Sequence, residues 1–231
     1  MNKQPEFVNN YFASIYLTII AFLQGAAIFQ LTPYLVSFFT TESNHFTDTS
    51  TAALILTLAI IVTVWHHYVN GVLFLRWFPN IIDALIPFGI SITEFLLISF
   101  LEKKGQPSVM NMYGWTLAFL GFLLIGSVAY FAAAIRNDAQ LISNFINKEL
   151  AAGHGKNIRR FYIQAGFSMT GQALFTIFIL IIHSESLLWF CLMFFIVHII
   201  ISEYRHLKHI LPLFKRGLRD FDMEDKLNRN Q

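Results

Sequence analysis

The chain has 231 residues and a formal net charge of +2, and 55% of its residues are hydrophobic while only 13% are charged. Soluble domains carry about 25% charged residues. The composition therefore excludes an ordinary soluble domain and predicts an integral membrane protein. The near balance of charge gives no sign of a nucleic-acid partner. The single cysteine, Cys191, excludes a disulfide within the chain and a cysteine metal cluster.

Long apolar runs predict an all-α, polytopic fold with six transmembrane helices. The expected spans are about 11–40, 51–77, 81–101, 112–135, 161–182 and 187–203, which together form one six-helix domain over residues 1–204. The first span is longer than a membrane requires, so we expect it to tilt or to kink at Pro33. Gly114, Gly121 and Gly126 in the fourth span predict close packing against a neighbouring helix.

A polar stretch separates the fourth and fifth spans. Its apolar residues recur at helical spacing, which predicts an amphipathic segment from Asn137 to Ala152 on the membrane surface or against another subunit. The last residues, 205–231, form a basic tail. We expect this tail to contact anionic lipids at the cytoplasmic face or a cytoplasmic protein partner.

The distribution of basic residues predicts the orientation of the chain. Of the 16 Lys and Arg residues, only Lys103 and Lys104 fall on one side of the six predicted spans. The others are Lys3, Arg76, the basic residues between the fourth and fifth spans, and those of the tail. Because basic residues stay in the cytoplasm, both termini are expected to be cytoplasmic, in a bacterial inner membrane.

An unusual group of polar residues lies in the second and third spans. His66, His67 and Asn70 occupy the second, and Glu94 occupies the third. Counted at about 1.5 Å per residue from the turn near Pro79, His67 lies roughly 18 Å and Glu94 roughly 21 Å into the membrane. We expect Glu94 to meet one histidine near mid-membrane, where these residues line a path or respond to pH. The alternative is an interhelical hydrogen-bond cluster that only holds the helices together.

Other polar residues are secondary candidates. Asp83, near the cytoplasmic end of the third span, suits an ion pair with Arg76 or a first-turn acid. A haem held between His198 and a histidine of the second span is the weaker reading. The sequence has no phosphate loop, no nucleophile motif and no Zn-binding spacing, and adjacent histidines lack the i, i+4 spacing of two ligands on one helix face. No catalytic, cofactor or metal residue is therefore predicted. The complete secondary set is Gln24, Gln30, Asp83, Gln172 and His198.

Two short fragments carry a resemblance to a known family. Trp65-His66-His67 and Ile86-Pro87-Phe88 are similar to fragments of the bacterial potassium channels related to the lysosomal potassium channel called transmembrane protein 175. The resemblance implies a tetramer of six-span subunits around a pore lined by the first helix. The family's first-helix signature, Arg, three residues, then Phe-Ser-Asp, is not matched, because the nearest fragment is Thr18 followed by Phe22-Leu23-Gln24.

Three functional hypotheses follow. The first is an oligomeric, channel-like membrane protein that is permeable to cations or protons, with a pore between subunits. The second is a non-catalytic membrane scaffold that presents the amphipathic segment from Asn137 to Ala152 and the basic tail to a cytoplasmic partner. The third is a haem-binding or enzymatic membrane protein, although no cofactor and no enzymatic activity are expected. We expect a homo-oligomer.

Overall fold

The computed structural model describes residues 6–40, 48–75, 81–102, 110–144, 148–182, 184, 186–205 and 207–208. Within this described part, every regular element is an α-helix and no strand occurs, so the all-α fold expected from the sequence is confirmed. The helices are α1 (Glu6–Thr40), α2 (Asp48–Leu75), α3 (Ile81–Ser99), α4 (Met112–Asn144), α5 (Lys148–Ile182) and a last helix, Ser186–Arg205, that we call the C-terminal helix.

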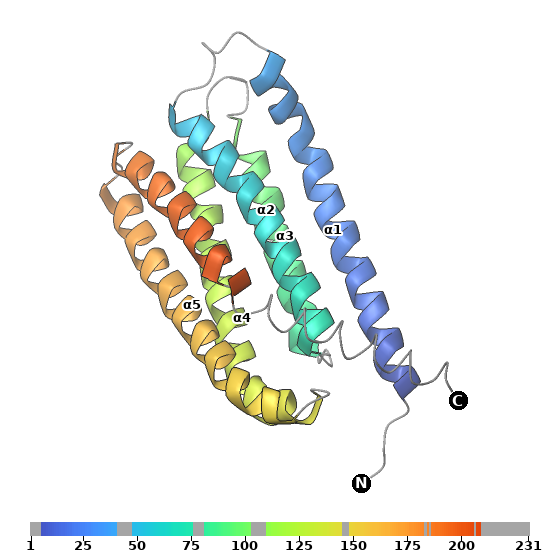
Figure 1. Ribbon diagram of the computed structural model, residues 1–231. Helices are drawn as coiled ribbons and strands as arrows, with labels where there is room; N and C mark the ends of the chain where they lie inside the picture. Colours follow the sequence, from blue (N-terminus) through green and yellow to red (C-terminus); the bar gives the residue numbers. More distant parts are fainter. Residues whose placement is uncertain are drawn as a thin grey trace.

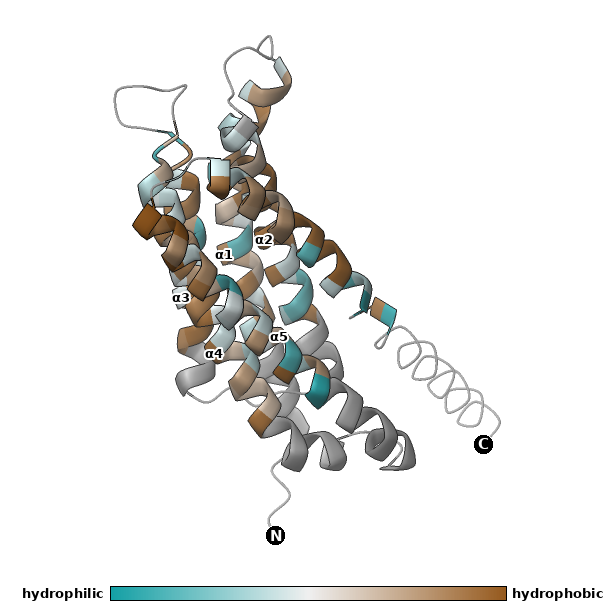
Figure 2. Cartoon of the chain, turned by 90° about the vertical axis from the view of Figure 1, so that its left-hand side faces the viewer, coloured by the Kyte–Doolittle hydropathy of each residue, from teal (hydrophilic) through white to brown (hydrophobic). Residues whose placement is uncertain are grey.

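Five of these helices are long and apolar enough to cross a membrane. Their apolar stretches are Ile15–Thr40, Thr49–Val69, Met112–Ile135, Arg159–Ile182 and Ser186–Arg205, and α3 adds a shorter one, Leu85–Ser99. Apolar residues dominate the described helices in Figure 2. On α1, Phe22, Phe29 and Phe39 are 73%, 81% and 79% exposed, which suits contact with lipid and not with water. The chain is a polytopic integral membrane protein.

Consecutive helices run in opposite directions (Figure 1). Helix α1 packs on α2 and α3, whereas α4 packs on α3 and, most extensively, on α5. The C-terminal helix lies beside α5 and runs toward the end of the bundle at which α1 begins. The ring of Phe195 on the C-terminal helix contacts that of Phe119 on α4, with 4.8 Å between their centroids.

The buried core centres on Trp115 of α4, whose side chain is fully buried. Its ring stacks on Phe119 at a centroid distance of 5.2 Å. The indole Nε1–H donates a hydrogen bond to Thr57 Oγ1 of α2 at 3.3 Å. Tryptophan brings a large apolar surface and one polar atom that needs a partner, so this contact ties α4 to α2 without an unpaired donor.

Close contact between α4 and α5 depends on two glycines. A Cβ atom at Gly126 would lie 2.6 Å from Met169 Cε, and one at Gly166 would lie 2.9 Å from the ring of Phe131. Small residues let helix backbones approach in lipid, where packing rather than water exclusion holds helices together. These glycines therefore allow the most extensive pair among α1–α5 to form.

The polar stretch after the fourth span is helical in its described parts. Helix α4 continues past its apolar part to Asn144, and α5 already begins at Lys148 and passes through Gly153 and Gly155. The described residues of the segment expected from Asn137 to Ala152 thus form the ends of these two long helices. No proline interrupts either end, and a glycine inside a helix costs only about 1 kcal/mol. The basic tail beyond residue 208 lies outside the described residues.

Candidate functional site, a histidine–glutamate cluster

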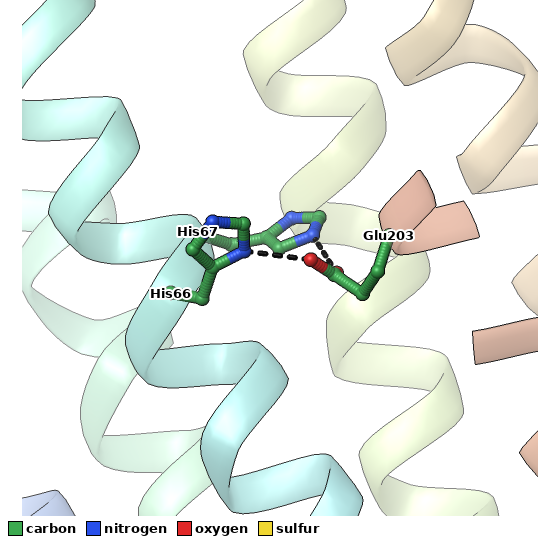
Figure 3. Close-up of side chains that lie close together, drawn as sticks. All are labelled: His66, His67 and Glu203. Carbon is green, nitrogen blue, oxygen red and sulfur yellow. Dashed lines mark hydrogen bonds and ion pairs between the residues drawn. The ribbon is translucent and has the colours of Figure 1, made fainter. Parts of the chain in front are cut away.

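His66 and His67 of α2 both face Glu203, which reaches toward them from the C-terminal helix (Figure 3). Nδ1 of His66 lies 2.6 Å from Oε2 of Glu203, and Nε2 of His67 lies 2.5 Å from Oε1. Each imidazole therefore contacts a different oxygen of the same carboxyl group. An ionised carboxylate only accepts hydrogen bonds, so in that state both of these ring nitrogens carry the proton that they donate. We call these three residues the His–Glu cluster.

Tyr130 of α4 extends the cluster on its other side. Its hydroxyl lies 2.9 Å from Nδ1 of His67, and its ring contacts that of Tyr162 on α5 with centroids 6.1 Å apart. With His67 neutral and Nε2 protonated, Nδ1 accepts the hydrogen of the tyrosine hydroxyl. Both nitrogens of His67 thus have a partner, and side chains from α2, α4 and the C-terminal helix form one hydrogen-bonded series.

The depth of the His–Glu cluster differs between its two helices. On α2, eight residues follow His67 before the helix ends at Leu75, and most of them are apolar. On the C-terminal helix, Arg205 follows Glu203 by only two residues. The expected mid-membrane position of the histidines stays a prediction.

Glu94 does not meet a histidine, and the expected pairing was wrong. Its side chain is fully buried, and Oε2 accepts a hydrogen bond of 2.8 Å from Nε2 of Gln24 on α1. Oε1 of Glu94 and Oε1 of Gln24 have no hydrogen-bond partner in the described part of the chain. Similar depth on neighbouring helices does not fix a side chain's direction, which turns by about 100° per residue. Here α3 directs Glu94 toward α1.

A cavity of about 150 Å³ lies beside the cluster and is lined by residues of all six helices. Its wall is mostly aliphatic and aromatic, and two groups of its polar side chains bear on function. One group is at the His–Glu cluster, and the other lies deeper, between α5 and the C-terminal helix. The polar lining residues that matter here are His67, Tyr130, Tyr162, Gln172, His198 and Glu203.

His198 leads the deeper polar group. It precedes Glu203 by five residues, which is about 7.5 Å along the helix. Its Nε2 lies 3.0 Å from Oγ of Ser168 on α5, and Gln172 also donates to that oxygen at 3.5 Å. One turn further along the C-terminal helix, Phe195 packs against Phe119. The polar lining therefore ends at an aromatic contact in the interior of the bundle.

The remaining sequence candidates lie elsewhere. Gln30 of α1 donates a hydrogen bond to Ser99 Oγ at 3.3 Å in an exposed contact, and neither Gln30 nor Gln24 lines the cavity. The side chains of Asn70 and Asp83 lie outside the described residues. The structure thus brings His66 and His67 together with a residue that the sequence analysis did not choose.

Glu203 and Tyr130 were missed at the sequence level. Glu203 is the one acidic residue of the predicted span 187–203, and that isolation was a usable signal, because an acid in an apolar run seeks a partner. Its partners could not be read from the sequence, since α2 and the C-terminal helix are far apart in the chain. Tyr130 gave no signal, because a tyrosine in an apolar helix is ordinary.

Comparison of the chain with family models, with curated proteins and with solved structures gave no match. The fold and the site define a polytopic α-helical membrane protein with a His–Glu cluster beside an interior cavity. The resemblance to the transmembrane protein 175 type of channel continues to rest on the two short sequence fragments.

Proposed function

We propose that the chain forms a membrane protein that lets cations or protons cross the bilayer, with the His–Glu cluster at the entrance of the path. The observation that carries the proposal is the position of this cluster. Its carboxyl group lies at a polar end of a cavity lined by all six helices. Ionisable side chains that face such a cavity mark ion and proton paths in membrane proteins, and acidic groups at an entrance favour cations.

The proposed path continues from the cluster toward His198 and Gln172. These side chains line the same cavity and are linked through Ser168. The contact of Phe119 with Phe195 then closes the path. An apolar constriction of this kind blocks ions by excluding water and opens when its side chains separate. We assign the role of gate to this pair.

The orientation follows from the basic residues. The α5 span begins with Arg159 and the C-terminal span ends with Arg205, and the C-terminal helix runs toward the end of the bundle at which α5 begins. By the positive-inside rule, we propose that this end faces the cytoplasm of a bacterial cell. Because the cavity lies within one chain, the proposed path does not need a pore between subunits. The homo-oligomer expected from the sequence stays a separate prediction.

Flux measurements in liposomes test the proposal. The purified protein is reconstituted, and cation and proton flux are followed with fluorescent indicators under an imposed voltage over a range of pH. We expect flux in the wild type, at least a fivefold loss with Glu203→Gln, and an increase with Phe119→Ala because the constriction widens. Gln30→Ala is the matched control, since Gln30 lies outside the cavity.

Two results would overturn the proposed function. One is the absence of flux from correctly folded wild-type protein at every voltage and pH. The other is equal flux in the wild type and the Glu203→Gln variant, which would remove the cluster from the path. The particle size of the same sample gives the number of subunits.

A further inference from the structure

We infer that the His–Glu cluster is a binding site for one divalent transition-metal ion of the Zn²⁺ type, held by Nδ1 of His66, Nε2 of His67 and the carboxylate of Glu203. The inference deepens the proposed function, because it names the class of cation that the same cluster holds. It rests on the proposed function only for what the bound ion is used for, and the binding itself is argued from the geometry. The three ligand atoms all lie within 4.8 Å of one another.

The donor set selects the class of metal. Two imidazole nitrogens and one carboxylate are a common ligand set of Zn²⁺ sites that keep a fourth position open. Imidazole suits Zn²⁺, Cu²⁺, Ni²⁺ and Fe²⁺, whereas Mg²⁺ and Ca²⁺ prefer oxygen ligands. The site is therefore expected to take late first-row metals in preference to Mg²⁺ or Ca²⁺.

The adjacent histidines converge because they use different nitrogens. Neighbouring residues on a helix point about 100° apart, which is why the sequence did not predict a shared ligand. Here His66 presents Nδ1, the nitrogen near its backbone, and His67 presents Nε2, the far one. The two rings stand edge to face at 74° with centroids 5.9 Å apart. One carboxyl group on the opposite helix can therefore reach both nitrogens (Figure 3).

Tyr130 gives independent support for a ligand role of His67. Metal-binding histidines usually have their second nitrogen fixed by a hydrogen bond, which sets the tautomer and the orientation of the ring. The Tyr130 hydroxyl lies 2.9 Å from Nδ1 of His67 and holds the ring with Nε2 toward Glu203. The bound histidine needs its hydrogen at Nδ1, so on binding the tyrosine oxygen changes from donor to acceptor.

Binding requires a small and balanced rearrangement. Zn–N and Zn–O bonds of about 2.0–2.2 Å in a tetrahedral site place the ligand atoms roughly 3.3 Å apart, compared with the present 2.5 and 2.6 Å. A shift of Glu203 by less than about 1 Å makes that room. The ion displaces the protons from Nδ1 of His66 and Nε2 of His67, and each neutral imidazole then carries its one proton on its other nitrogen, so no net proton is released. A proton leaves to water only from an imidazole that was charged before binding.

The ligand atoms of the cluster are not sealed off by helix packing. The side chains of His66, His67 and Glu203 are 25%, 15% and 20% exposed, and His67 and Glu203 also line the cavity. On the C-terminal helix, Glu203 is followed by Tyr204 and Arg205, residue types that suit a membrane–water boundary.

Direct binding to purified full-length protein in detergent tests the inference. The protein is prepared without a histidine tag, stripped with a chelator, and equilibrated with Zn²⁺ for elemental analysis or with Co²⁺ for visible absorption. We expect one ion per chain and a tetrahedral Co²⁺ spectrum. Affinity should fall at least a hundredfold in Glu203→Gln and in His67→Ala, and about tenfold in Tyr130→Phe.

Control variants separate this site from the other histidines of the chain. His198→Ala removes a histidine that lies outside the cluster, and Glu94→Gln removes a buried carboxyl group that lies outside it, so both should bind Zn²⁺ like the wild type. Thermal unfolding and gel filtration establish that each variant is folded. Because Glu203→Gln keeps the shape of the side chain, it remains informative where His67→Ala does not fold.

The outcomes distinguish this inference from the proposed function. Equal binding by the wild type and Glu203→Gln, or no binding by the folded wild type, overturns the metal site. One Zn²⁺ per chain without ion flux in liposomes supports the metal site and contradicts the proposed function. Flux from a protein that binds no metal supports the proposed function and overturns the metal site.

Discussion

Two carboxyl groups of this protein lie in opposite surroundings. Glu94 is fully buried between α3 and α1, and its hydrogen-bond partner is one amide, Gln24. Glu203 is 20% exposed and lies between two imidazoles, two residues before Arg205 on the C-terminal helix. An ionised carboxylate without a counter-charge costs several kcal/mol in such a membrane interior. The comparison assigns a packing role to Glu94 and leaves ion binding to Glu203.

The largest effect on stability is expected from Glu94→Ala. It leaves the buried amide of Gln24 without its partner and opens a void, so unfolding should become easier by about 3 kcal/mol. Glu94→Gln is the matched control and should stay within about 1 kcal/mol of the wild type, because it keeps the shape and a hydrogen-bonding group. Unfolding by sodium dodecyl sulfate in mixed micelles measures both. Equal stability of the two variants would contradict a packing role.

Glu203→Gln should have the reverse profile. Because the side chain is partly exposed, the free energy of unfolding should change by less than about 1 kcal/mol. The affinity for Zn²⁺ should fall at least a hundredfold, since the amide of glutamine is a poor metal ligand. Parallel unfolding and metal-binding measurements test this profile. A large loss of stability with unchanged metal binding would make Glu203 a structural residue like Glu94.

The sequence predicts the helices of this protein but not which polar side chains meet. The helices followed from apolar runs alone, because a membrane span requires about 20 apolar residues whatever it packs against. The sequence marks His66, His67 and Glu94 as unusual polar residues, but their pairing depends on helix rotation and on which distant helix lies opposite. Glu94 turns to α1, and the histidines turn to a helix more than a hundred residues later. Sequence periodicity does not determine either direction.

Tyr130→Phe is expected to have a smaller effect on the same cluster. The variant keeps the ring packing against Tyr162 and loses the hydrogen bond to His67. Loss of one hydrogen bond of this kind costs about 1 kcal/mol of stability, and loss of a group that orients a metal ligand costs about tenfold in affinity. Titration with Zn²⁺ measures the affinity, and Tyr162→Phe is the control, because its hydroxyl does not hold His67. Identical affinities of the two variants would show that Tyr130 does not orient the histidine.

The smallest change is expected when both partners of the buried pair are replaced. Gln24→Leu or Glu94→Leu alone leaves one polar group buried without a partner and should cost about 2 kcal/mol. The double variant removes both groups and places apolar side chains of similar size between α1 and α3. Its stability should return to within about 1 kcal/mol of the wild type, because burying a polar pair gains little over apolar packing. Sodium dodecyl sulfate unfolding of the four proteins forms a complete double-mutant cycle. Additive losses in the double variant would mean that Gln24 and Glu94 act separately, and the contrast with Glu203 would then lose its physical basis.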